Sequence, residues 1–154
     1  MDKKILIYDL DETLCEKKRP EQTYSEVKPI KPMIEQLNRF YDEGHTIIIQ
    51  TARNMVTQGN DVGKVLQNVG EITLKWLREN NVKYHSILFG KAYGSMYIDD
   101  KSVRPSELME YGIDGVQKML IEEKEKIKKY MEEKLWIIQL QWFQLLEEDQ
   151  EWCL

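Results

Sequence analysis

The sequence contains few of the features that mark secreted or membrane-spanning proteins. Only two of its 154 residues are cysteine, Cys15 and Cys153, so we expect no disulfide framework and predict a cytoplasmic location. No run of about 18 apolar residues is present, which argues against a membrane-spanning helix. The N-terminal segment also lacks a cleavage-site pattern, so a signal peptide is not expected.

The chain also lacks the positive charge that binding to a nucleic-acid backbone requires. Its formal net charge is −5, and no cluster of Lys and Arg lies near the motifs described below. Hydrophobic residues make up 42% of the chain and charged residues 32%, as in ordinary globular proteins. At this length the chain can bury a real core within one domain, and a small anionic substrate remains compatible with its acidity if a local cation attracts it.

Apolar runs and helical stripes alternate along the first two thirds of the chain. Short runs rich in β-branched or aromatic residues predict strands at 4–8, 46–50, 86–89 and 96–98. Stripes of helical spacing predict one helix from Pro32 to Tyr41 and a second at 65–80, with polar loops at 14–29 and 52–63. This alternation is typical of an α/β fold, a Rossmann-like parallel sheet with helices on both faces.

The last third of the chain has a different pattern. A short helix is expected at 105–111, and from Val116 a long helix carries the charge run 122–129 beside a stripe of apolar residues. We therefore predict a catalytic domain at 1–115 and a helical extension at 116–154. The extension either packs on its own domain or joins copies of the chain into a homo-oligomer; a membrane-surface role is disfavoured because Gln and Glu surround its last apolar residues. The predicted stripe comprises Leu120, Ile127, Met131, Leu135, Ile138, Trp142 and Leu145, with Trp136, Ile137, Leu140 and Phe143 on a second face.

Acidic residues fall where the predicted strands end. In a parallel sheet all strand C-termini open onto one edge, where ligands bind. Carboxylates gathered there need a cation, and a few oxygen ligands suit Mg²⁺. A hydroxyl and an ammonium group add what phosphoryl transfer requires, which is charge neutralisation and positioning. The converging residues are Asp9 and Asp11 after the first strand, Thr51 at the end of the second, Lys91 after the third, and Asp99 and Asp100 at the end of the fourth.

Each of these features taken singly has a structural explanation. Asp favours turns, a Thr that ends a strand is usually structural, and a lone loop Lys is usually solvated. Their occurrence together, each at a strand end, favours a functional site. Arg53, two residues after Thr51, is predicted to contact the substrate because a guanidinium suits phosphate. Cys15 lies near the same site and is expected to be inert.

Four segments in this order resemble the motifs of the haloacid dehalogenase-like (HAD) hydrolases. ILIYDLDETLC is similar to the first motif, an apolar strand followed by D-x-D-x-T, and IIIQTARN is similar to the second, an apolar strand ending in Thr. Lys91 corresponds to the lysine of the third motif, and MYIDD resembles the fourth, an apolar strand ending in two acids. The resemblance spans residues 4–100.

Membership of that family implies a role for each matching residue. Asp9 would attack phosphorus and form an aspartyl-phosphate, while Asp11 would protonate the leaving oxygen and later activate water. Thr51 and Lys91 would hold the phosphoryl oxygens. Mg²⁺ would be bound by Asp9, the backbone carbonyl of Asp11, and Asp99, with Asp100 either a ligand or a support for one.

A closer likeness narrows the expected substrate. The stretches TARNM, VGKVLQNVGEITLKWLRENNV and FGKAYGSMYIDDKSV resemble small HAD phosphatases associated with capsular polysaccharide biosynthesis, which act on sugar phosphates. The chain departs from that pattern at Ala92, where Pro is expected, and at Ser95, where Asp is expected. The 37 residues between Thr13 and Thr51 and the 39 between Thr51 and Lys91 leave no room for a cap domain, so we expect an open site.

Other functions share part of this pattern. A polynucleotide 3′-phosphatase can share a cap-less fold of this type, but it needs a basic groove with aromatic platforms. A receiver-like signalling domain gathers similar residues in a different order along the chain, and a catalytically silent scaffold would lack Asp9 or Asp11. A phosphotransferase activity, in which the hydroxyl group of an acceptor replaces water, remains an alternative.

Overall fold

The computed structural model describes the backbone of residues 2–150 and the side chains of residues 2–139. Cys153 and four members of the predicted apolar faces lie outside the described side chains; these are Leu140, Trp142, Phe143 and Leu145. The chain forms two compact units, Met1–Tyr97 and Ile98–Leu154. The sequence placed the boundary between a catalytic domain and a helical extension at 115/116, and this assignment stays a prediction.

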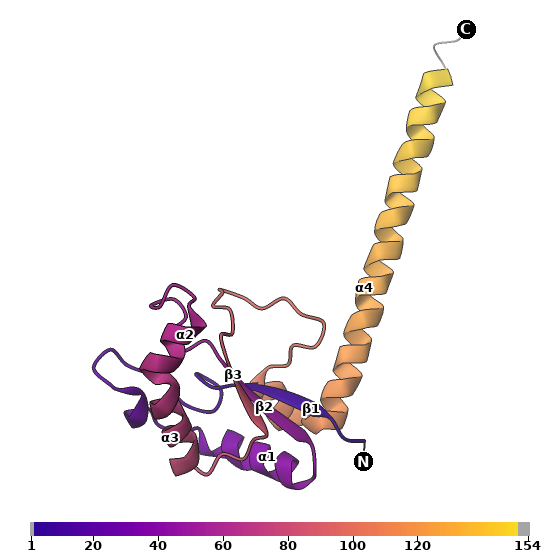
Figure 1. The fold of residues 1–154 in the computed structure, drawn as a ribbon. Helices are drawn as coiled ribbons and strands as arrows, with labels where there is room; N and C mark the ends of the chain where they lie inside the picture. The colour runs from indigo at the N-terminus through magenta and orange to yellow at the C-terminus, as the bar shows by residue number, and fades with distance from the viewer. Residues whose placement is uncertain (1, 151–154) are drawn as a thin grey trace. The chain divides into compact units, whose positions relative to one another are not determined.

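A parallel sheet forms the centre of the first unit (Figure 1). Its strands are β1 (Ile5–Asp9), β2 (Thr46–Thr51) and β3 (Ser86–Phe89), in the spatial order β1-β2-β3. In the register, Ile7 lies opposite Ile48, and Ile49 lies opposite Ile87. Every second side chain of β2 is buried, as the pleat of a strand requires. All three strands were predicted, and their carboxyl ends meet at one edge.

Helices connect these strands as the sequence predicts. Helix α1 (Lys31–Asp42) has Pro32 in its first turn and buries the face that carries Met33, Leu37 and Phe40. Gly44 follows it with φ +87°, a left-handed conformation that glycine adopts without strain. Between β2 and β3, α2 (Val62–Val65), the π-helix η2 (Leu66–Gly70) and α3 (Glu71–Glu79) form one run of helical backbone.

The loop after β1 is anchored at its base. Within it lies only the short 3-10 helix η1 (Tyr24–Glu26). The two ends of the loop pair through an isolated bridge between Cys15 and Pro29. The indole Nε1 of Trp76 on α3 donates a 2.8 Å hydrogen bond to the carbonyl oxygen of Val27, and both side chains are buried. The segment predicted as a loop or flap is therefore held against α3.

The predicted strand at 96–98 is wrong: these residues have no strand partner, and the sheet contains three strands within the part of the chain that the structure describes. Met96 and Ile98 are 78% and 95% exposed. Three apolar residues are few for a strand, and local contacts compete with pairing here. The Tyr97 ring lies 4.2 Å from the Lys91 ammonium, and its hydroxyl donates to the carbonyl of Ala92.

The second unit consists of residues 98–104 followed by α4 (Pro105–Gln150). Gly112 interrupts α4 with φ +63° and ψ −173°, so residues 105–111 form a separate short helix, as predicted. Beyond this kink the predicted apolar stripe remains exposed at Ile127, Met131 and Leu135. No helix in the described residues combines the length and apolar composition needed to cross a bilayer. Homo-oligomerisation through this extension stays a prediction.

Candidate active site

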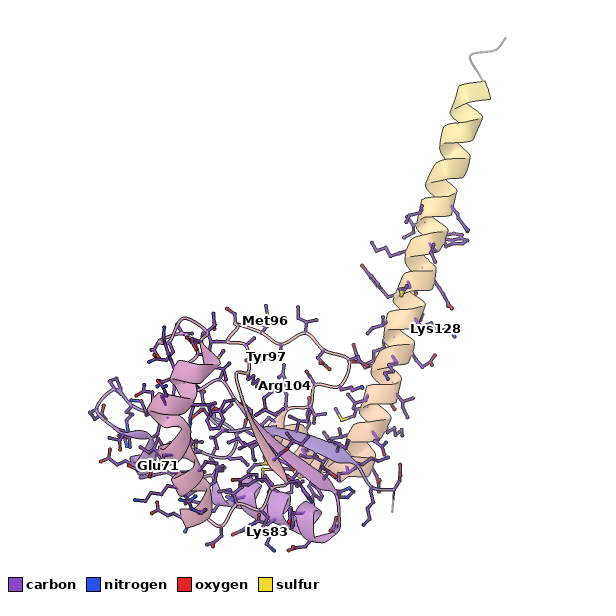
Figure 2. The ribbon with its side chains drawn as sticks, viewed as in Figure 1. Glu71, Lys83, Met96, Tyr97, Arg104 and Lys128 are labelled. Atoms are coloured by element: carbon purple, nitrogen blue, oxygen red, sulfur yellow. The ribbon has the colours of Figure 1, made fainter. Side chains whose placement is uncertain are left out.

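The carboxyl ends of the three strands bring together four of the predicted residues. Asp9 is the last residue of β1, Thr51 is the last residue of β2, and Lys91 follows β3 by two residues. The backbone N–H of Lys91 donates a 3.1 Å hydrogen bond to the carbonyl of Thr51, which fixes the start of the Lys91 loop beside β2. Asp11 joins this group, since the Thr51 hydroxyl lies 3.5 Å from its Oδ2. Figure 2 shows the side chains of this unit around the sheet.

Asp9 and Lys91 form a direct ion pair. The Lys91 ammonium lies 2.8 Å from Asp9 Oδ2, and Asp9 Oδ1 accepts a 2.9 Å hydrogen bond from the backbone N–H of Leu10. The Asp9 side chain is 33% exposed and that of Lys91 16%. A carboxylate that is reachable from solvent and lies beside a cation can meet an incoming anion, because the ammonium offsets repulsion between the two negative groups.

Asp11 has a different partner, the guanidinium of Arg53. Arg53 Nε lies 3.0 Å from Asp11 Oδ1 and 3.1 Å from Oδ2, so one N–H is shared by both oxygens. The turn that follows Asp11 places Glu12 at φ +60°, in the left-handed region. The backbone N–H of Leu14 then donates to the carbonyl of Leu10 at 2.9 Å, which closes this turn of the D-x-D-x-T segment.

The structure encloses Arg53, for which the sequence predicted a contact with the substrate. Its side chain is 0% exposed, and its Nε already meets the Asp11 carboxylate. Its Nη1 donates to the Thr73 hydroxyl at 3.2 Å, and its Nη2 lies 3.4 Å from the sulfur of Cys15. The guanidinium carbon lies 4.5 Å from the centre of the Tyr24 ring. Arg53 is thus enclosed by the chain itself.

Two of these neighbours of Arg53 were missed by sequence reasoning. Thr73 is a fully buried polar residue on the face of the 62–79 helical run that also carries Val69, Trp76 and Leu77. A hydroxyl within an apolar stripe indicates a buried hydrogen bond, and this pattern in the sequence could have identified Thr73. Tyr24 lies in the loop after β1, and no spacing in the sequence links it to Arg53.

Thr51 and Cys15 are both fully buried. The Thr51 hydroxyl accepts a 3.1 Å hydrogen bond from the backbone N–H of Arg53, which ties the two residues together. Burial and, next, the negative charge of Asp11 raise the pKa of the Cys15 thiol to about 12. The thiol therefore stays protonated at neutral pH, in line with the expectation that it is inert. Burial likewise raises the pKa of the Tyr24 hydroxyl.

Asp99 and Asp100, the predicted metal ligands from the fourth motif, belong to the second unit. Asp99 Oδ1 accepts a 2.7 Å hydrogen bond from the backbone N–H of Lys101, and Asp100 Oδ2 lies 3.5 Å from the Lys124 ammonium. Both side chains are exposed. Among the described residues, no three His, Cys, Asp or Glu side chains form a group that could hold a metal ion.

The chemistry of the residues present nevertheless fits a magnesium ion. Asp9 ends β1 and Asp11 lies two residues later, and both carboxylates are partly exposed. Carboxylate and carbonyl oxygens are the ligands that Mg²⁺ takes, usually one or two carboxylates together with water and phosphate oxygens. The donor set at the end of β1 therefore suits Mg²⁺ without His or Cys.

Comparison with known proteins gives one informative relationship. The crystal structure of a target protein from Vibrio cholerae matches this chain with a TM-score of 0.73 and 37% sequence identity. The match covers 78% of this chain and 98% of that one. No family model matches the chain, and no curated protein matches it.

Proposed function

This chain belongs to the same family as the Vibrio cholerae protein, and we propose that it is a magnesium-dependent phosphatase with a HAD-like fold. The substrate is a phosphate monoester, and the resemblance to capsule-associated phosphatases favours a sugar phosphate. The observation that carries the proposal is the ion pair between Asp9 and Lys91 at the carboxyl ends of β1 and β3. A reachable carboxylate beside a positive charge supports the proposal, because attack on a phosphoryl group needs both.

In this mechanism each residue at the sheet edge has a defined role. A carboxylate oxygen of Asp9 forms a bond to phosphorus, and the bond between phosphorus and the ester oxygen breaks. Asp11 gives its proton to the departing oxygen, which leaves as an alcohol. Water then attacks the aspartyl-phosphate while Asp11 takes up its proton, and inorganic phosphate and free Asp9 result. Lys91 and the Thr51 hydroxyl stabilise the phosphoryl oxygens.

Asp9, the backbone carbonyl of Asp11, and Asp99 would hold Mg²⁺, with Asp100 as the alternative or supporting acid. The ion supplies positive charge that neutralises the transferred group. Here Asp99 and Asp100 are exposed, and among the described residues their contacts are to the Lys101 N–H and the Lys124 ammonium. Surface contacts of this kind cost little to exchange for a metal ion.

The test is a panel of phosphate monoesters that includes sugar phosphates, assayed with and without Mg²⁺. Replacement Asp9→Asn should lower kcat by about 10³-fold or more, because the amide cannot act as the nucleophile. Asp42→Asn is the matched control, since that carboxylate is exposed on α1 and pairs with Lys83, outside the sheet edge. Full turnover by Asp9→Asn, or no hydrolysis of any ester by the wild type, would refute the proposal.

The metal assignment has its own measurement. Asp99→Asn and Asp100→Asn should each raise the Mg²⁺ concentration that gives half-maximal activity, and the direct ligand should raise it by the larger factor. Activity that persists unchanged in EDTA, or an unchanged Mg²⁺ requirement in both variants, would contradict the assignment.

A further inference from the structure

We propose that Arg53 is a positioning residue, which fixes the carboxylate of Asp11 for proton transfer without touching the substrate. This inference rests on the proposed phosphatase function. It assigns a task to a residue whose sequence position suggested a substrate contact, and it explains why a full positive charge is enclosed beside the site.

The contacts of Arg53 hold it from several sides. Its backbone N–H donates to the Thr51 hydroxyl, its Nη1 donates to Thr73, and its Nη2 lies against Cys15. Its planar face lies over the ring of Tyr24. These partners come from β2, α3 and the loop after β1, where Tyr24 lies in η1. A side chain enclosed in this way has little rotamer freedom, so its Nε–H points in one fixed direction.

That fixed N–H meets both oxygens of Asp11, at 3.0 and 3.1 Å. The Asp11 side chain is 31% exposed, so the carboxylate is held on one side and open on another. A buried guanidinium needs a negative partner, and among the described contacts Asp11 is its only carboxylate. The pair therefore ties the orientation of the catalytic carboxylate to the buried core.

Orientation matters for a general acid because proton transfer requires the donor to lie within hydrogen-bond distance of the leaving oxygen. Without Arg53, Asp11 retains the longer contacts to the Thr51 hydroxyl and the Cys15 thiol, at 3.5 and 3.6 Å, so its orientation is held less tightly. Phosphate esters with poor leaving groups need the proton, whereas aryl esters with good leaving groups need it far less. Loss of Arg53 should therefore slow alkyl phosphates selectively.

The experiment measures kcat/KM for an alkyl phosphate and for p-nitrophenyl phosphate, in the wild type and in Arg53→Ala, Arg53→Lys and Arg39→Ala. Arg39 is a matched control because it is an exposed arginine on α1. For the alkyl ester we expect a fall of about 100-fold in Arg53→Ala, the lower part of the usual range for general acid catalysis. For the aryl ester we expect a fall of less than about 10-fold, since the aryl leaving group departs with little help from an acid.

Two further readouts separate positioning from other roles. Added guanidinium ions should restore part of the alkyl phosphatase activity of Arg53→Ala, because they fit the enclosed space that the side chain leaves, whereas ammonium ions should not. Inhibition by inorganic phosphate should be unchanged within about twofold, since Arg53 is enclosed and does not bind the phosphoryl group. A much weaker inhibition would make Arg53 a substrate contact and overturn the inference.

An equal fall for the two esters would also overturn it, because a general loss of structure slows both reactions alike. Circular dichroism checks that the variants fold. If Arg53→Ala does not fold, Thr73→Val carries the test, since it removes only one acceptor of the guanidinium and should show the same selectivity at a smaller magnitude. An inactive wild type would instead refute the proposed function itself, so the two failures are distinct.

Discussion

Replacement of Trp76 by Phe should lower the free energy of unfolding by about 2–4 kcal/mol. The indole is 1% exposed, and its Nε1 is 2.8 Å from the carbonyl oxygen of Val27, a residue that is also buried. Phe cannot donate this hydrogen bond, and a buried carbonyl that loses its donor costs about 1–3 kcal/mol. The smaller ring also leaves a cavity, which adds roughly 1 kcal/mol.

For a chain of this length, such a loss corresponds to a decrease in Tm of about 5–15 °C. Urea denaturation and thermal unfolding, both followed by circular dichroism, measure the two quantities. Trp136→Phe is the matched control, because Trp136 is 63% exposed on α4 and its replacement should change stability by less than about 0.5 kcal/mol. If Trp76→Phe were as stable as this control, the hydrogen bond to Val27 would not anchor the loop after β1.

Two other predictions concern buried groups with a raised pKa. Cys15 should resist iodoacetamide at pH 8 in the folded protein and react after unfolding in urea, because it is buried with a pKa of about 12. Mass spectrometry of the peptide that contains Cys15 measures the labelling. Rapid labelling of the folded chain would contradict the prediction. Tyr8→Phe should keep or raise stability at pH 7, by up to about 1 kcal/mol, because the buried Tyr8 hydroxyl has no hydrogen-bond partner among the described residues. Burial raises the pKa of Tyr8 above its ordinary value of 10.0, so the unfolded chain ionises first, and stability is complete below pH 10 and falls above it. Denaturation at pH 7 and pH 11 should show that the wild type loses more stability than Tyr8→Phe, and an equal loss would contradict the prediction.

Local sequence patterns were sufficient to predict most of the first unit. The apolar runs that became β1, β2 and β3 are short, rich in β-branched residues and separated by helical stripes, so the strand type and the order of elements followed directly. The parallel arrangement then placed Asp9, Thr51 and Lys91 at one edge, because parallel strands end on the same side. The structure shows these three residues close together.

Features that depend on tertiary contacts could not be predicted in the same way. The apolar triplet at 96–98 resembles a strand locally, but a strand also needs a partner, and Tyr97 contacts Lys91 and Ala92 instead. The enclosure of Arg53 was missed for a similar reason. Cys15, Tyr24 and Thr73 lie between 20 and 38 residues away from Arg53, and no spacing rule brings such residues to one guanidinium.

The different cations beside Asp9 and Asp11 suit the different tasks that we propose for the two carboxylates. Lys91 is partly exposed, and its ammonium is a point charge on a flexible stem, so it can move from Asp9 to an arriving phosphoryl oxygen and leave the nucleophile free. Arg53 is fully enclosed and cannot make such an exchange, so Asp11 stays oriented through both halves of the reaction. Exchange of lysine and arginine at these two positions should therefore slow both the attack by Asp9 and the proton transfer by Asp11. In Arg53→Lys the ammonium cannot reach Asp11 and Thr73 together, and in Lys91→Arg the guanidinium would hold Asp9 through two N–H groups and hinder its attack.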